Sequence, residues 1–221
     1  MSRPADWTPL AAADPVPGDP VEVALTGKRL RQAADQMSAD VSWLRSLCTA
    51  RFWDAGAGQA FRGQVDDAAA KLTRARDRYL AVSEALGSSL TDPGYAGALE
   101  AAQSLSLRAL TQARQAWAAM RAQLAAIAGP APYAGTPPPS SGTALPRLDS
   151  SGNPVPMVTP AGAGPRLSAA VSLYNASAAQ YRTANGWLGE AIALRDEAAA
   201  RAVALIKAAT GTDCALEHAQ T

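Results

Sequence analysis

Few residues of this chain have the type and spacing that catalysis requires. The single histidine, His218, lies four residues after Cys214, so the two could share one face of a helix and contact a metal ion. A zinc site needs a second pair of ligands, and the sequence offers none with metal-site spacing. A nucleophilic triad would have to use the same histidine, which we expect to lie in a frayed tail, 212–221. The sequence therefore predicts no metal centre and no triad.

Carboxylates with arginines nearby form two groups, Asp66 with Asp67, and Glu190 with Asp196 and Glu197. A general acid and base pair needs one desolvated member, whereas carboxylates beside arginines are typical of an ion-paired helix surface. The run Gly56-Ala57-Gly58 precedes a helical pattern but lacks the Gly-Lys-Ser/Thr ending of a phosphate loop. We therefore expect a protein that is not an enzyme and binds no cofactor.

Trp53 is the residue that remains after these exclusions. It lies in a glycine-containing break, 51–58, between two long periodic segments. An indole at that place can cap the open end of a helical hairpin or contact a partner protein. The sequence leaves both interpretations open.

Apolar residues that alternate three and four positions apart predict four long helices. The first helix begins after Asp19-Pro20, a cap residue followed by a proline at the first helical position, and is about 28 residues long. The third begins in the same way at Asp92-Pro93 and runs to 128. The apolar positions of the four helices are Leu30, Ala34, Met37, Val41, Leu44 and Cys48; Phe61, Val65, Ala68, Leu72, Ala75, Tyr79, Val82 and Leu86; Leu110, Ala113, Trp117, Met120, Leu124 and Ile127; and Leu167, Val171, Tyr174, Ala178, Tyr181, Leu188, Ile192, Ala199, Ala202, Ile206 and Ala209.

The predicted fold class is all-α, an elongated antiparallel helical bundle with a Pro/Gly-rich linker. We expect an extended N-terminal arm over 1–18 and a three-helix block over 19–128. The segment 129–165 holds ten of the 16 prolines, which excludes a packed helix, and is predicted to be the linker. A fourth long helix over 166–211 is expected to pack on the block.

The charge balance and the hydropathy exclude several classes of binding partner. The net charge is +1, so the strong positive field of a nucleic-acid-binding protein is missing. Arginines and lysines interrupt the most apolar stretches, so we expect no stable membrane insertion. The first 20 residues contain prolines and Asp6 where a Sec signal peptide has an apolar core. The alanine-rich composition, with 5% aromatic residues, favours close helix packing over a sandwich or barrel.

The segment from Phe52 to Phe61 resembles the turn of the WXG-like helical hairpins found in actinobacterial type VII secretion systems. It is most similar to the longer N-terminal domains that carry secreted toxins of those systems. In that pattern a Trp is followed by a small-residue stretch and by Phe eight positions later, which Trp53 and Phe61 match. Ala55 stands where the pattern has Gly, and Gly56 follows one position later. No tyrosine is followed four residues later by Asp or Glu, the export signal that the family tends to carry.

The resemblance implies a non-enzymatic targeting and partner-binding domain. Its expected partners are small WXG-like helical hairpin proteins and the secretion ATPase of the export machinery. It would be cytoplasmic before export and then secreted by a Sec-independent route. The expected partner-binding residues lie in the turn and on the second helix: Trp53, Ala55, Gly56, Phe61, Val65, Leu72 and Tyr79. The alternative from the residues alone is a self-associating cytosolic helical scaffold or adaptor unrelated to secretion.

Overall fold

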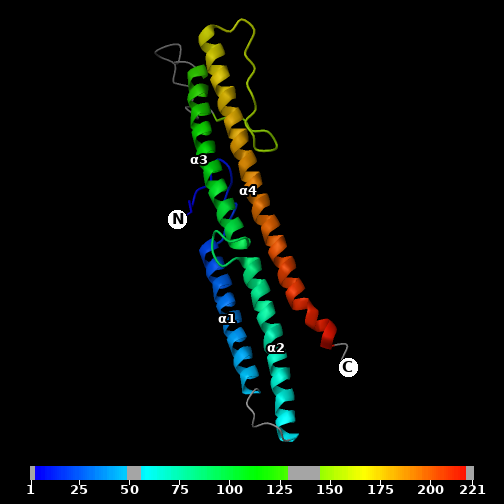
Figure 1. Cartoon of the computed structure of the whole chain (residues 1–221). Coiled ribbons are helices and arrows are strands. Elements are labelled where there is room, and N and C mark those ends of the chain that lie inside the picture. Colours follow the sequence, from blue (N-terminus) through cyan, green and yellow to red (C-terminus); the bar gives the residue numbers. More distant parts are fainter. Residues whose placement is uncertain (1–2, 49–55, 129–144, 218–221) are drawn as a thin grey trace. The chain divides into compact units, whose positions relative to one another are not determined.

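The structure is a computed structural model that describes residues 3–48, 56–128 and 145–217. It is all-α, as predicted, and the described residues form four helices and no strand. The helices are α1 (Pro20–Leu47), α2 (Gly56–Leu86), α3 (Tyr95–Ala128) and α4 (Pro165–Glu217), drawn in Figure 1. Contacts divide the chain into two compact units. Unit 1 holds 1–17 with 102–193, and unit 2 holds 18–101 with 194–221.

This division differs from the predicted three-helix block over 19–128. Only the beginning of α3 groups with α1 and α2, because the boundary crosses α3 after Ala101. The boundary crosses α4 after Ala193, so each unit contains part of both long helices. The rest of α3 groups with the N-terminal arm and with the first half of α4. Sequence order therefore does not define the units, and α3 and α4 each contribute residues to both of them.

The predicted start of α1 is confirmed, whereas that of α3 is not. Asp19 caps α1 as predicted, because its carboxylate accepts hydrogen bonds from the backbone N–H groups of Val21 and Glu22. The predicted start of α3 at Asp92-Pro93 is wrong by two residues, because the carboxylate of Asp92 accepts the hydroxyl of Ser88 at 2.6 Å and does not cap the helix.

The predicted end of the last helix at Gly211 is also wrong, since α4 continues to Glu217. A glycine inside a helix costs about 1 kcal/mol but does not by itself end the helix.

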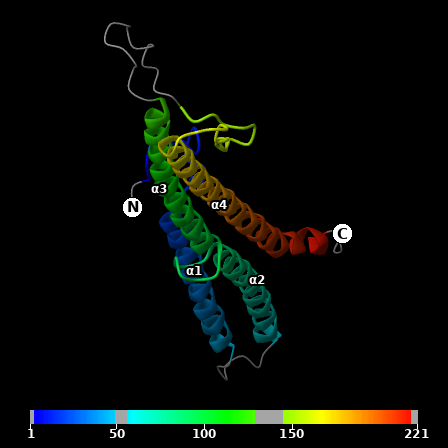
Figure 2. The same cartoon turned by 90° about the horizontal axis from the view of Figure 1, so that it is seen from above.

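In unit 2, α1 and α2 pack against each other as an antiparallel hairpin, side by side in Figures 1 and 2. The predicted apolar positions of α1 are all buried or half-buried, with Ala34 at 1% and Val41 at 5% exposure. Gly27 lies at the closest approach of α1 to the end of α2, and the buried Ser83 donates its hydroxyl to the carbonyl oxygen of Gly27 at 2.8 Å. The hairpin is therefore joined by both apolar and polar contacts.

In unit 1, α3 and α4 lie side by side and form the buried core (Figures 1 and 2). The core cluster consists of Ala113, Ala116, Met120, Tyr174, Ala178, Tyr181 and Ala184, with Leu10, Trp117, Leu124 and Met157 packed against it. The rings of Trp117 and Tyr181 lie 5.7 Å apart and are tilted by 45°. Alternating aromatic and alanine side chains let the two helices approach closely and still fill the space between them.

The described part of the predicted linker, 145–164, has no helix or strand, in agreement with its prolines. One isolated bridge joins Leu148 to Pro154. The segment is attached to α4, because the side-chain amide of Asn175 donates to the carbonyl oxygen of Met157 at 2.9 Å and accepts from its N–H at 2.8 Å. It is therefore a strap held on α4 within unit 1.

Candidate functional site

The predicted partner-binding turn is described only at its end. Trp53 and Ala55 lie outside the described residues, so their place in a site stays a prediction. Gly56 is the first residue of α2, and Phe61 lies half-buried in the second turn of that helix. The described helices end at Leu47 and begin again at Gly56, so the last three residues of the predicted break, 56–58, belong to α2.

The other predicted site residues lie along α2. Val65 is 6% exposed and Leu72 is half-buried, whereas Tyr79 is 39% exposed. All three belong to the predicted apolar stripe, yet only Val65 is fully covered. The stripe of α2 is therefore only partly covered by α1.

Apolar side chains at the centre of unit 1 are more completely buried than those of the α2 stripe. The central positions of the α3 and α4 stripes are covered, with Met120 at 0% exposure and Tyr174 and Tyr181 at 2% each, whereas Trp117, Leu124 and Ile127 of α3 are half-buried. The N-terminal arm adds to the cover in unit 1, since its Leu10 packs against the core cluster. In the α1–α2 hairpin, by comparison, Leu72 is half-buried and Tyr79 is exposed.

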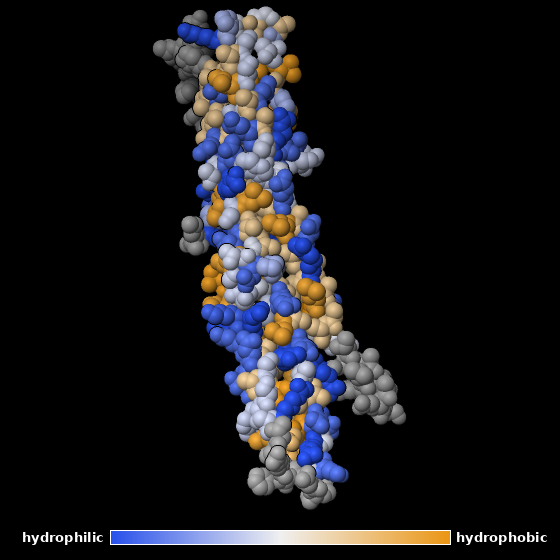
Figure 3. Space-filling model, in the orientation of Figure 1, coloured by the Kyte–Doolittle hydropathy of each residue, from blue (hydrophilic) through white to orange (hydrophobic). Residues whose placement is uncertain are grey.

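A cleft of about 420 Å³ lies in unit 2 beside the end of α2. It is lined by small side chains, including Ala85, Ala98, Ala198 and Ala202, and by Leu205 of α4, which is 54% exposed. Charged groups on its walls are Glu84, Asp92 and Arg201. In the view of Figure 3 the apolar side chains form small groups separated by polar ones.

The carboxylates that the sequence analysis considered as a possible acid and base pair lie on helix surfaces. Asp66, Asp67 and Glu190 are exposed on helices, and Asp196 is paired with its neighbour Arg195. Among the described residues no group of three or more His, Cys, Asp or Glu side chains could hold a metal ion. His218 lies outside them. No helix in the described part of the chain has the length and apolarity to cross a bilayer.

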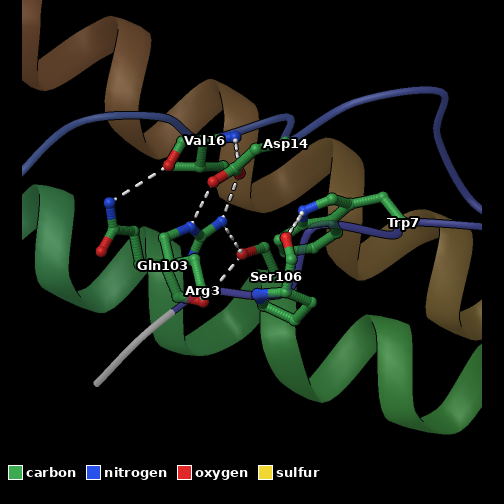
Figure 4. A network of polar contacts seen from close by, with 7 residues as sticks. Arg3, Trp7, Asp14, Val16, Gln103 and Ser106 are labelled. Atoms are coloured by element: carbon green, nitrogen blue, oxygen red, sulfur yellow. Dashed lines mark hydrogen bonds and ion pairs between the residues drawn. The ribbon is translucent and has the colours of Figure 1, made fainter.

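The most elaborate polar arrangement is one that the sequence did not predict. The N-terminal arm, residues 3–17, is ordered and lies on α3 and α4, as Figure 4 shows for its first half and for Val16. Arg3 forms a bidentate pair with Asp14 at 2.5 Å and places its guanidinium 4.7 Å from the centre of the Trp7 ring. It also donates to the hydroxyl of Ser106 at 3.2 Å. Arg3 thus connects both ends of the arm to α3.

Two apolar side chains fix the arm in place. Trp7 is 1% exposed and Val16 is 0% exposed, although both lie in a proline-containing segment with no helical pattern. The indole N–H of Trp7 donates to the carbonyl oxygen of Pro4 at 3.0 Å, so its one polar group is paired. A large apolar residue between prolines is the sequence signal that could have indicated a docked arm.

The electrostatics of the arm favour its docked state at neutral pH. The hydrogen bonds from Arg3 hold the pKa of Asp14 below its ordinary 3.8, and the backbone N–H of Val16 adds to this effect against the opposing effect of burial. Burial raises the pKa of Tyr181 above 10.0, so its phenol is protonated and donates to the carbonyl oxygen of Pro9 at 2.8 Å. At neutral pH the carboxylate of Asp14 is therefore ionised and pairs with Arg3, and the phenol of Tyr181 is protonated and donates to Pro9.

Comparisons with known proteins do not assign this chain to a family. No protein family, no curated protein and no solved structure matches the chain. The two surfaces described above, the half-covered hairpin in unit 2 and the occupied groove in unit 1, are therefore interpreted from their own chemistry.

Proposed function

We propose that this chain is a non-enzymatic targeting and partner-binding domain of a type VII secreted effector. Its α1–α2 hairpin binds a small WXG-like helical hairpin protein, and the complex is passed to the secretion ATPase. The chain is cytoplasmic until a Sec-independent route exports it. This proposal rests on the resemblance of the segment from Phe52 to Phe61 and on the surface of the hairpin.

The observation that carries the partner-binding proposal is the incomplete cover of the α2 stripe. Tyr79 is 39% exposed on a stripe where Val65 is 6% exposed, while Met120, Tyr174 and Tyr181 in the core of unit 1 are at most 2% exposed. A half-covered heptad stripe has the geometry that a further helix can complete by knobs-into-holes packing. A partner helix would bury Tyr79 and the remaining half-exposed positions.

The test is co-expression with the WXG-like hairpin proteins encoded by neighbouring genes, followed by measurement of the affinity of the purified pair. Trp53→Ala is expected to weaken association by about 2 kcal/mol or more, since buried aromatic anchors dominate interfaces. Tyr79→Ala is expected to weaken it by more than about 1 kcal/mol with little effect on folding. Val65→Ala is the matched control, because Val65 was predicted to bind the partner but is only 6% exposed in the hairpin. It should lower the free energy of unfolding by about 1–3 kcal/mol and leave association of the folded protein nearly unchanged.

Two results would contradict the proposal. One is the lack of a complex with any neighbouring hairpin protein. The other is a complex in which Trp53→Ala and Tyr79→Ala bind as the unmodified chain does.

The self-associating scaffold is the second candidate, because the same half-covered stripe can be closed by another copy. In that case the purified chain forms a homo-oligomer without any partner, and Tyr79→Ala makes it monomeric. Light scattering coupled to gel filtration separates the two functions.

A further inference from the structure

The N-terminal arm has the contacts of a bound peptide. Residues 3–17 contain no helix or strand, and their contacts place them with α3 and α4. Leu10 packs against the core cluster, and Trp7 and Val16 are buried at the two ends of the contact. Short extended segments that bury a few anchors in a groove between helices are a common form of peptide recognition.

The helices recognise the main chain of the arm as well as its side chains. Tyr181 donates to the carbonyl oxygen of Pro9 at 2.8 Å, and Gln103 donates to that of Val16 at 3.1 Å. Arg114 donates to the carbonyl oxygens of Thr8 at 3.2 Å and of Asp6 at 2.8 Å. Four carbonyl groups along the arm are thus bound by side chains of α3 and α4. None of these bonds depends on the arm being covalently joined to the same helices.

The connection between the arm and α1 is short and contains a glycine with a positive φ angle. It consists of Pro17, Gly18 and Asp19, and the φ angle of Gly18 is +126°, which favours glycine. A short connection of this kind, flanked by prolines, is the type of hinge at which a terminal segment can be exchanged between copies at low cost.

We propose that the groove of α3 and α4 is a peptide-binding site, that the arm is its exchangeable ligand, and that the arm of a second copy can occupy it. The partner is therefore another molecule of this chain, and it contributes Trp7, Val16 and the four carbonyl groups. In an exchanged dimer each groove is filled by the arm of its neighbour, with the same contacts as in the monomer. This surface is separate from the α1–α2 hairpin of the proposed function.

The test uses the full chain and a fluorescent peptide with the sequence of residues 3–17. In the unmodified protein the tethered arm competes at an effective concentration that is millimolar for a short linker, so the peptide should bind weakly. Trp7→Ala in the protein weakens the tethered arm, and the peptide should then bind at least tenfold more tightly, measured by anisotropy. Adding Arg114→Ala and Tyr181→Phe to that variant should weaken peptide binding again by at least tenfold, because four hydrogen bonds to the peptide are lost.

Arg3→Ala provides a second way to loosen the arm, in case Trp7→Ala does not fold. It removes the pair with Asp14 and leaves the indole of Trp7 in place, and it should also raise the affinity for the peptide. A folded variant of either kind that binds the peptide no better than the unmodified chain would overturn the peptide-binding site.

Exchange between copies is tested by light scattering on the unmodified chain after long incubation at high concentration. A dimer that dissociates when excess peptide is added is the expected result. A chain that stays monomeric, or a dimer that the peptide does not affect, would overturn the exchange. A dimer held by the α2 stripe would instead respond to Tyr79→Ala, so the two associations are distinguishable.

Discussion

Gly27 of α1 lies against the backbone of Gly87, which follows the last residue of α2. A Cβ atom on Gly27 would stand 2.1 Å from the carbonyl oxygen of Gly87, well inside van der Waals contact. Gly94 also lies against this residue, since a Cβ atom on Gly94 would stand 2.6 Å from the nitrogen of Gly87. Three glycines therefore form a backbone-to-backbone crossing in unit 2 that no side chain can enter.

The first prediction follows from this crossing. Gly27→Ala should lower the free energy of unfolding by about 1–3 kcal/mol or more, because the overlap is with backbone and cannot be relieved by a rotamer change. Gly63→Ala is the control, since Gly63 is exposed in α2 and has nothing within 4 Å of an added Cβ. It should raise stability by about 0.5–1 kcal/mol through helix propensity. Urea denaturation measures both, and equal effects would contradict the crossing.

The second prediction concerns the two buried tyrosines of α4. Tyr181→Phe removes a hydrogen bond of 2.8 Å and leaves the carbonyl group of Pro9 unpaired, so it should destabilise the protein by about 1–2 kcal/mol. Tyr174→Phe removes only a long contact of 3.4 Å to the carbonyl oxygen of Val155 and should cost less than about 1 kcal/mol. A larger loss for Tyr174 in thermal or urea unfolding would show that the arm is not held as described.

The third prediction is a pH dependence that originates in Asp14. The pKa of its carboxyl is lower in the folded protein than the ordinary 3.8, so its contribution to stability is fully present above that value. The contribution is lost as the pH falls through the folded pKa. Asp14→Asn should therefore destabilise the protein at pH 7, and the difference from the unmodified chain should shrink below about pH 4. A difference that is constant from pH 7 to pH 3 would exclude this ion pair as its source.

The fourth prediction tests the strap over unit 1. Asn175 uses both ends of its amide on the backbone of Met157, and Asn175→Leu removes both hydrogen bonds. Trypsin should then cleave after Arg147 faster than in the unmodified chain, since local opening of the segment exposes the peptide bond. Thr183→Val, which alters an exposed residue of α4 that bonds only within its own helix, is the control and should not change the rate.

Much of the helical framework could be predicted from the sequence, because the signals are local. Asp19 caps α1 where a cap followed by proline was expected, and the heptad positions Val171, Ala178 and Leu188 are all buried. Periodicity specifies which face of a helix is apolar, and in a chain with few large side chains that face has to be covered.

The division into units and the docked arm could not be predicted in the same way. Trp7 and Val16 belong to a segment without periodicity, and the groove that buries them is made by residues about 90 or more positions away. The choice between a free arm and a docked one depends on this tertiary contact and not on the segment itself. The close backbone contact at Gly27 does have a sequence signal, because an isolated glycine inside a helical pattern can indicate close backbone approach.

The docked arm also has a consequence for the order of events during synthesis on the ribosome. Pro9 and Tyr181 are separated by 172 positions, so the arm emerges long before the helix that binds it. At 5–20 residues per second this interval is roughly 10–35 s. The α1–α2 hairpin, whose contacts are closer in sequence, can form in that time. Trp7 of the nascent chain therefore stays uncovered through most of translation. During that time a chaperone that binds extended apolar segments can bind the arm.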